Sequence, residues 1–158
     1  MAISICLCII LAIVTLDQFS KICLMETSFT LIKNFIIIEP RYNDGAAFSS
    51  FSGARYFFLG FTIIALVVMF YFLFSGKWSK SLFFRLTLSI MIGGVIGNFL
   101  DRLILGPVRD FIYLPTFKFV CNIADIAITV ACVMFVIYLF FIRDKEETQK
   151  KIEKIKEL

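Results

Sequence analysis

The stretch LFFRLTLSIMIGGVIGNFL, residues 82–100, decides the fold class, because it is long and apolar enough to cross a bilayer as a helix. Three further stretches share this character, and they cover residues 1–20, 56–74 and 119–142. Hydrophobic residues make up 60% of the chain, whereas soluble domains contain about half. The sequence therefore predicts an all-α membrane protein with four transmembrane helices.

Residues 21–55 and 101–118 join the first span to the second and the third to the fourth, and we expect both segments outside the membrane. The first contains FTLIKNFIIIE, whose β-branched residues favour a strand, followed by the Pro and Gly of EPRYNDGAAFSS. The second carries Pro107 and Pro115 and is also typical of extended chain. Together they predict a small β-rich extracytoplasmic platform beside the helices.

The distribution of positive charge predicts the orientation. An even number of spans puts both termini on one side, and cytoplasmic segments are enriched in Lys and Arg. Lys77 and Lys80 lie between the second and third spans, and residues 143–158 carry several more cations, although the opposite side is not free of them. We therefore expect both termini in the cytoplasm, residues 1–142 as one membrane domain, and residues 143–158 as a charged cytoplasmic tail.

The composition excludes several kinds of site. The chain contains no His, which removes His-based acid–base catalysis and the commonest metal ligand. Its five Cys form no CxxC pair and lie mostly in apolar runs, where Cys acts as a small hydrophobic residue. The net charge of +4 comes from scattered Lys and Arg without a basic stripe, which argues against a nucleic-acid partner. We expect neither a metal nor a cofactor.

Polar residues gather near one end of the third and fourth spans, where lipid offers them no partners and each suggests a function. Asn98, Asp101 and Arg102 stand at i, i+3 and i+4, so they share one helix face. Asn122 and Asp125 stand at i and i+3 on the fourth span. A GxxxG pattern just before Asn98 lets a neighbouring helix approach closely, which brings the two clusters together.

Asp110, between these spans, and Asp125 can act as a carboxylate pair that activates water. Like-charge repulsion within such a pair leaves one carboxyl ionised as a base and one protonated as an acid near neutral pH. This chemistry needs no histidine, metal or cofactor. The alternative is that Asp125 forms a structural ion pair with Arg102 or Arg109 and that Asp110 is an exposed loop acid.

Five motifs occur together in the chain: LDQFSK (16–21), YNDGAAFS (42–49), GGVIGNFLDR (93–102), VRDFI (108–112) and CNIADIAI (121–128). Their order and approximate spacing resemble those of the lipoprotein signal peptidases, also called signal peptidase II. The resemblance covers residues 12 to 142. Five ordered motifs are far more specific than any one of them.

The resemblance implies a bacterial inner-membrane aspartic endopeptidase that removes the signal peptide of prolipoproteins. Such an enzyme cuts just before the diacylglyceryl-modified cysteine of the lipobox. It implies that Asp110 and Asp125 are the catalytic pair, and that Asp17 and Lys21 are a supporting structural pair. The residues that match the family's polar positions around the site are Asn43, Asn98, Asp101, Arg102 and Asn122.

The partners that follow from this resemblance are diacylglyceryl-modified prolipoproteins and membrane lipid, and we expect the chain to act as a monomer. Two positions depart from the family pattern. Cys121 stands where Phe more often precedes the NxAD sequence, and Arg109 stands where an apolar residue commonly precedes the catalytic Asp. Neither change removes an acid of the motifs.

A small transporter or channel subunit is the alternative function, in which Asp125 and Asp101 bind or relay cations. A relay needs polar groups spread across the depth of the bilayer, whereas a peptidase needs its two acids together at one interface. The middle of every span lacks acids, which favours the peptidase. A catalytically inactive scaffold would have no reason to keep all five motifs.

Overall fold

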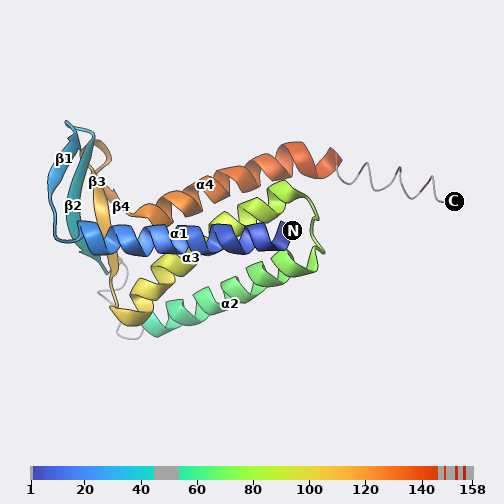
Figure 1. The fold of residues 1–158 in the computed structure, drawn as a ribbon, viewed down its shortest axis with the longest axis horizontal. Helices are drawn as coiled ribbons and strands as arrows, with labels where there is room; N and C mark the ends of the chain where they lie inside the picture. The colour runs from blue at the N-terminus through green and yellow to red at the C-terminus, as the bar shows by residue number, and fades with distance from the viewer. Residues whose placement is uncertain (1, 45–53, 146–147, 149–151, 153–154, 156–158) are drawn as a thin grey trace.

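The computed structural model describes residues 2–44, 54–145, 148, 152 and 155, and within them the chain forms four long helices and one small sheet (Figure 1). The helices are α1 (Ala2–Leu24), α2 (Ala54–Ser75), α3 (Leu82–Ile104) and α4 (Ile123–Ile137), which continues as a π-helical stretch over Tyr138–Ile142. Each is part of a span long and apolar enough to cross a membrane. The predicted fold class is thereby confirmed.

The strands form one antiparallel sheet, in the order β1-β2-β3-β4, at one end of the helix bundle (Figure 1). They are β1 (Phe29–Ile32), β2 (Ile36–Asn43), β3 (Val108–Leu114) and β4 (Phe119–Cys121), with a 3-10 turn at Pro115–Phe117. The pairing of β2 with β3 shifts register between Ile38 and Arg41. Pro40 lies at this irregularity and has no N–H to give to the ladder.

α3 is the central helix and contacts each of the other three. Half of its apolar window is buried, compared with 17% or less in α1, α2 and α4. Glycines permit this close packing: a Cβ on Gly93 would stand 2.9 Å from Cβ of Ile13 in α1, and one on Gly94 would stand 2.6 Å from the carbonyl oxygen of Ala124 in α4. A Cβ on Gly97, which completes the GxxxG pair with Gly93, would stand 2.6 Å from Oδ2 of Asp17 in α1 and 3.1 Å from Cβ of Ala124 in α4. The GxxxG pattern therefore serves the contact with α1 as well as the expected contact with α4.

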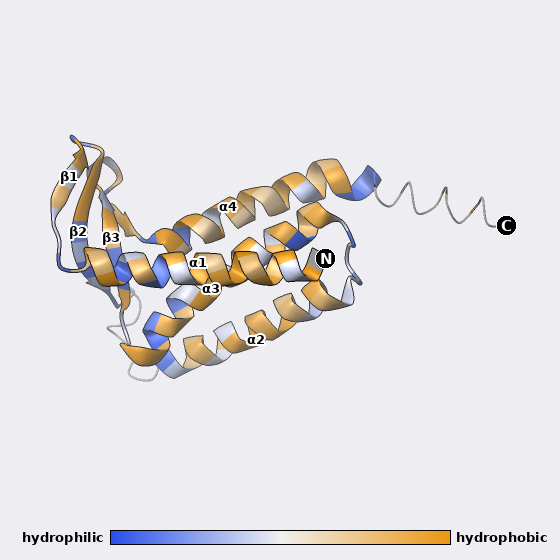
Figure 2. Cartoon of the chain, viewed as in Figure 1, coloured by the Kyte–Doolittle hydropathy of each residue, from blue (hydrophilic) through white to orange (hydrophobic). Residues whose placement is uncertain are grey.

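The buried charged groups of the bundle lie at the sheet end. Figure 2 shows hydrophobic residues along most of each helix and hydrophilic turns where α1 and α3 approach the sheet. Cys6 and Ile10 of α1 pack with Leu73 of α2 and Ile92 of α3 in an apolar cluster. The buried charged side chains of the described residues all lie nearer the sheet, and they are Asp17, Lys21, Asp101 and Asp110. Polar function is therefore expected at that end.

The helix bounds differ from the prediction near the sheet. α1 continues to Leu24 and α3 to Ile104, so the residues predicted to begin the extracytoplasmic segments are helical. α4 begins at Ile123 and not at residue 119, because Phe119–Cys121 pair with β3 as a strand. The polar residues at the ends of α1 and α3 stay helical because they form hydrogen bonds and ion pairs with neighbouring elements. The hydrophobic pattern of a single span does not reveal such interactions.

The end of α3 directs the chain into β3. The N–H groups of Leu105 and Gly106 both donate to the carbonyl of Asp101, over 2.8 and 3.1 Å. Gly106 has φ 101°, a conformation that glycine adopts at little cost, and Pro107 cannot continue the helix. This turn places Asp110 on a strand that begins immediately beyond the span.

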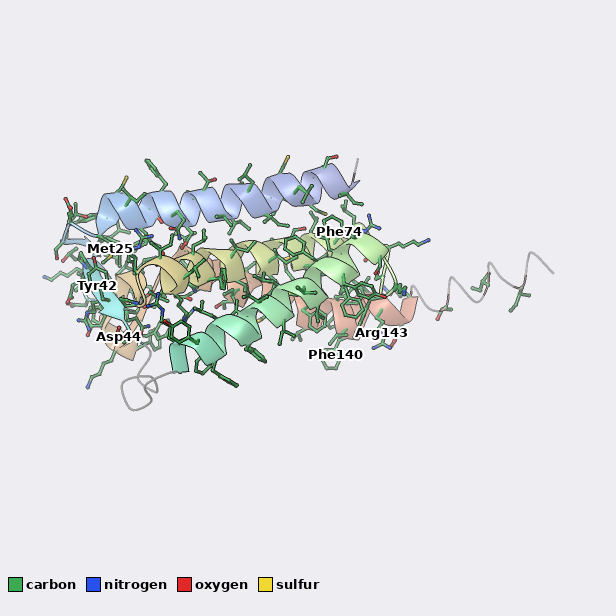
Figure 3. All side chains as sticks on the ribbon, turned by 90° about the horizontal axis from the view of Figure 1, so that it is seen from below. Met25, Tyr42, Asp44, Phe74, Phe140 and Arg143 are labelled. Atoms are coloured by element: carbon green, nitrogen blue, oxygen red, sulfur yellow. The ribbon has the colours of Figure 1, made fainter. Side chains whose placement is uncertain are left out.

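The start of α1 and the end of α4 lie at the same end of the bundle, opposite the sheet (Figure 1). Figure 3 shows Tyr42 and Asp44 at the sheet end, whereas Phe74, Phe140 and Arg143 lie at the other. This arrangement agrees with an even number of spans. Residues 45–49 of the YNDGAAFS motif and most of the charged segment 143–158 lie outside the described residues.

Candidate active site

Asp110 is held by the pairing of two strands that come from separate extramembrane segments. In the β2–β3 ladder, Asp110 stands opposite Arg41 and Val108 stands opposite Asn43. The amide nitrogen of Asn43 donates to Oδ2 of Asp110 over 2.8 Å. Asp110 is only 1% exposed, so it is not the exposed loop acid that was considered as an alternative.

Asp125 is held by the first turn of α4. Asn122 is the N-cap residue, and its side-chain oxygen accepts a hydrogen bond from the N–H of Asp125 over 3.0 Å. Oδ2 of Asp125 accepts in return from the N–H of Asn122 over 3.1 Å, which completes a capping box. The sequence NxxD therefore both starts the helix and orients this carboxylate.

Two side-chain amides connect the two acids. Nδ2 of Asn122 donates to Oδ1 of Asp110 over 2.7 Å and to Oδ1 of Asn98 over 3.0 Å. Nδ2 of Asn98 donates to Oδ1 of Asp125 over 2.7 Å. The structure thus brings together Asp110, Asp125 and the three Asn side chains that the sequence singled out, from β2, β3, α3 and α4.

A buried ionic cluster lies beneath this group. Nζ of Lys21 is 2.8 Å from Oδ2 of Asp17 and 3.2 Å from Oδ2 of Asp101, and it also donates to Asn98 over 3.1 Å. Oδ1 of Asp17 accepts from the N–H of Ala124 over 2.9 Å, at the start of α4. Asp17 and Lys21 are therefore more than an i, i+4 pair, because they tie α1 to α3 and α4.

Sequence reasoning missed the roles of Arg109 and Gln18. The Arg109 guanidinium binds Oδ1 of Asp101 over 2.7 Å and Oε1 of Gln18 over 2.8 Å. The N–H of Arg109 donates to Oδ2 of Asp101 over 2.9 Å. Gln18 could have been identified from the sequence, because it is a polar amide next to Asp17 within an apolar span, where lipid offers no hydrogen-bond partner.

The ion pairs considered for Asp125 are absent from the described residues. Arg109 pairs with Asp101, and the guanidinium of Arg102 reaches only the carbonyl of Asn98, over 3.5 Å. Arg102 shares the face of Asn98 but is half-buried and does not join the ionic cluster. Asp125 is bound by amide donors instead, so its charge is not neutralised by a neighbouring cation.

Burial controls the electrostatics of the extramembrane groups at the site. Burial raises the pKa of Asp110, the hydrogen bond from Asn43 partly offsets this, and the neighbouring Asp125 charge raises the pKa further. Burial, together with Asp125 and Asp110, also raises the pKa of the Cys121 thiol to about 11. Cys121 is therefore a protonated packing residue near neutral pH and not a nucleophile.

Two linked carboxyls with different surroundings are suited to acid–base chemistry on a bound polar group. Asp110 is enclosed, whereas Asp125 is partly exposed and lies at the positive end of α4. Neither acid forms an ion pair among the described residues, and both accept amide hydrogen bonds that leave their oxygens fixed. Such an arrangement can give and take protons without a histidine.

Comparisons with known proteins agree with this geometry. The family model described as signal peptidase (SPase) II matches residues 9–141. A lipoprotein signal peptidase of Lactobacillus johnsonii is 42% identical over 118 residues, which cover 74% of this chain and 76% of the relative. One from Staphylococcus aureus is 34% identical over 152 residues, which cover 91% of this chain and 90% of the relative.

A solved structure of a bacterial membrane enzyme superposes with a TM-score of 0.80 at 32% identity, and the match covers 89% of this chain and 95% of that one. A second solved bacterial membrane enzyme gives a TM-score of 0.76 at 33% identity, covering 87% and 88%. Both the fold and the sequence therefore match along most of the chain. This multi-pass membrane protein belongs to the signal peptidase II family.

Proposed function

We propose that the chain is an aspartic endopeptidase in which Asp110 and Asp125 activate the water that attacks the scissile peptide bond. The observation that carries this proposal is the amide-linked pair of acids, free of ion pairs among the described residues, at the point where β3 and α4 meet the bundle. The buried charged groups gather at this end and are not spread along the spans, which supports a peptidase over a cation relay.

The two acids have different roles in this mechanism. Asp110 is assigned the role of the acid, because burial raises its pKa and favours the neutral form. Asp125 is assigned the role of the base, because it is partly exposed and its carboxylate is oriented by hydrogen bonds from the N–H of Asn122 and the amide of Asn98. Asp125 takes a proton from water and passes it to the leaving amine, while Asp110 donates a hydrogen bond to the carbonyl oxygen of the substrate.

The neighbouring residues position this pair. Asn98 donates to Asp125 and Asn122 donates to Asp110, which fixes the two carboxyls relative to each other. Asn43 donates to the second carboxyl oxygen of Asp110. Arg102 is half-buried at the end of α3, where its charge is available to the polar part of a lipid-modified substrate. The cluster of Asp17, Lys21 and Asp101 keeps α1, α3 and α4 at the spacing that this arrangement needs.

The substrate is a prolipoprotein whose signal helix and diacylglyceryl group remain in the bilayer while the scissile bond reaches the interface. Cleavage falls just before the modified cysteine of the lipobox. The protein acts as a monomer in the bacterial cytoplasmic (inner) membrane, with both termini in the cytoplasm and the site near the extracytoplasmic face. The position of the sheet and the acids at the end of the bundle opposite Arg143 supports this orientation.

The test is a cleavage assay of the purified protein in detergent with a diacylglyceryl-modified prolipoprotein. Asp110→Asn and Asp125→Asn are each expected to lose roughly 10³-fold or more of the rate, since each removes one half of a unit. Asp144→Asn, at the opposite end of the molecule, is the matched control and should cleave normally. Mass spectrometry should place the lipid-modified cysteine at the new N-terminus.

Near-full activity of either folded dyad variant would exclude the proposed mechanism. Thermal unfolding of each variant, measured in the same detergent, separates a loss of catalysis from a loss of fold. A wild-type product that begins at any residue other than the modified cysteine would exclude the proposed cleavage position while leaving the dyad in place.

A further inference from the structure

The end of the sheet farthest from Asp110 exposes a cluster of apolar side chains. It consists of the β1–β2 turn and the turn that joins β3 to β4, and we call these two turns the sheet tip. Its apolar residues are between 47% and 67% exposed, although they lie outside the membrane spans: Leu31, Ile32, Phe35, Phe117 and Phe119. The hydroxyl of Thr116 donates to the carbonyl of Asn34 over 3.2 Å, which joins the two turns into one surface.

The position of the sheet tip relative to the bundle limits what can cover it. Figure 1 shows the sheet lying across one end of the helices, with both turns reaching beyond the side of the bundle. The apolar outer surfaces of the helices indicate that lipid surrounds the bundle at this side (Figure 2). The sheet tip therefore overhangs the surface of the surrounding bilayer and not the protein's own helices.

The charges of the sheet tip complement a phospholipid surface. Lys33 lies in the first turn and Lys118 in the second, each beside aromatic or branched apolar residues, and neither segment 29–36 nor segment 114–121 contains an acid. Lys118 has φ 49°, a left-handed conformation that costs an L-residue free energy and that Gly or Asn adopts more cheaply. A lysine is thus present at a position where local backbone preference favours another residue.

We propose that the sheet tip is a lipid-binding anchor that inserts into the extracytoplasmic surface of the bilayer. Its aromatic and aliphatic side chains enter the boundary between headgroups and acyl chains, as in amphipathic segments that lie in the interface. Lys33 and Lys118 bind lipid phosphates, so the sheet tip binds more strongly to a bilayer that contains anionic lipid. A large exposed apolar surface next to a membrane needs such a partner, because water solvates it poorly.

The anchor fixes the height of the active site above the membrane. β3 runs without interruption from Asp110 to Leu114, next to the second turn of the sheet tip, a length of about 13 Å at ~3.3 Å per residue. Holding one end of this strand at the headgroups therefore holds Asp110 at a defined depth. A substrate whose cysteine carries a diacylglyceryl group presents its scissile bond at a depth that the same interface sets.

Tryptophan fluorescence tests the anchor without any substrate. Trp78 is the only tryptophan and lies at the opposite end of the bundle, so Trp78→Phe provides a silent background for a reporter, Phe117→Trp. The protein is reconstituted into phosphatidylcholine nanodiscs whose acyl chains are brominated near the headgroup. We expect the Phe117→Trp reporter to lose roughly half of its emission, because tryptophan at this position sits in the interface.

A matched reporter, Tyr42→Trp in the same background, lies at the other end of the sheet and should be quenched less by the brominated lipid. Quenching of the Phe117→Trp reporter by aqueous acrylamide, without quenching by lipid, would overturn the proposal. The assay measures the position of the sheet tip and not cleavage, so its failure would leave the proposed peptidase function unaffected.

The lysines are tested by adding phosphatidylglycerol to the brominated nanodiscs. Lipid quenching of the reporter should increase with the anionic fraction, and Lys33→Gln with Lys118→Gln should abolish this increase. Lys77→Gln with Lys80→Gln, on the loop at the opposite end, is the control and should leave it unchanged. If lipid quenching changes neither with the phosphatidylglycerol fraction nor on substitution of Lys33 and Lys118, the charge-based part of the proposal is overturned.

Discussion

At the scale of single residues, the two acids differ most in what surrounds them. Asp110 lies on β3 and is buried beside β2 and Asn122, whereas Asp125 lies partly exposed at the start of α4. Burial raises the pKa of Asp110, so this carboxyl keeps its proton to a higher pH than a free Asp. In the proposed mechanism, activity is lost on the alkaline side as Asp110 ionises.

The Asn43 hydrogen bond gives this pH dependence a testable sign. Its amide donates to Asp110 and stabilises the ionised form, which lowers the pKa of Asp110. Asn43→Ala should therefore raise the pKa of Asp110, and the alkaline limb of kcat/KM against pH should move to higher pH. Tyr42→Phe, at the adjacent residue, is the control and should not move it. An alkaline limb that stays in place, or moves to lower pH, contradicts this role for Asn43.

Arg109 acts on the acids indirectly, as a positioning residue. Its guanidinium and its N–H both bind Asp101, and the guanidinium also binds Gln18, so it ties β3 to α3 and α1 one residue before Asp110. Arg109→Leu should lower kcat by about 10- to 100-fold with little change in KM, because a small displacement of Asp110 is costly for catalysis. Arg109→Lys keeps the charge and should restore part of the rate.

The experiment compares steady-state kinetics of the two Arg109 variants with their thermal unfolding. Equal kcat in wild type and Arg109→Leu contradicts a positioning role. A fall in kcat without a fall in the temperature of thermal unfolding distinguishes displacement of Asp110 from general unfolding.

At the scale of elements, the close approach of α3 and α4 is what joins Asn98 to Asp125. Gly94 lies one turn from Asn98 and faces the backbone of Ala124, which belongs to the first turn of α4. Any side chain at this position pushes α4 outward. Because the capping box at Asn122 orients Asp125, displacement of α4 also moves a proposed catalytic group.

Gly94→Ala should lower the free energy of unfolding by about 1–3 kcal/mol, because the new Cβ would stand 2.6 Å from a backbone oxygen that cannot rotate away. Gly60→Ala on α2 is the matched control, since no heavy atom lies within 4 Å of its Cβ position. Thermal unfolding in one detergent measures both variants. A Gly94→Ala protein as stable as Gly60→Ala contradicts the observed packing of α3 against α4.

At the scale of the whole molecule, the sheet and the buried charges occupy one end of the bundle, and the start of α1 and the end of α4 occupy the other. The proposed orientation places the sheet end outside the cytoplasm. In a chain without its native Cys, Glu39→Cys should react with a membrane-impermeant maleimide in intact cells. Lys77→Cys should react only after permeabilisation, because it lies on the opposite end. The reverse pattern contradicts the proposed orientation.

The sequence alone determined the number of spans, the strand character of the two extramembrane segments and the polar positions that gather at the site. These features follow from local properties: span length and hydropathy, β-branching, Pro and Gly, and helical spacing. They were sufficient to select Asp110, Asp125, Asn98 and Asn122, whereas Asn43 came from the family resemblance, and the structure brings all five together.

The tertiary structure alone decided which group pairs with which. Asp101 binds Arg109 and Lys21, Arg102 stays outside the ionic cluster, and Asn122 both caps α4 and holds Asp110. It also moved the start of α4 to Ile123, because β4 pairs with β3 ahead of it. The physical reason is that hydrogen bonds and ion pairs act over about 3 Å, so they depend on distances between elements that helix packing sets and that spacing along one chain does not contain.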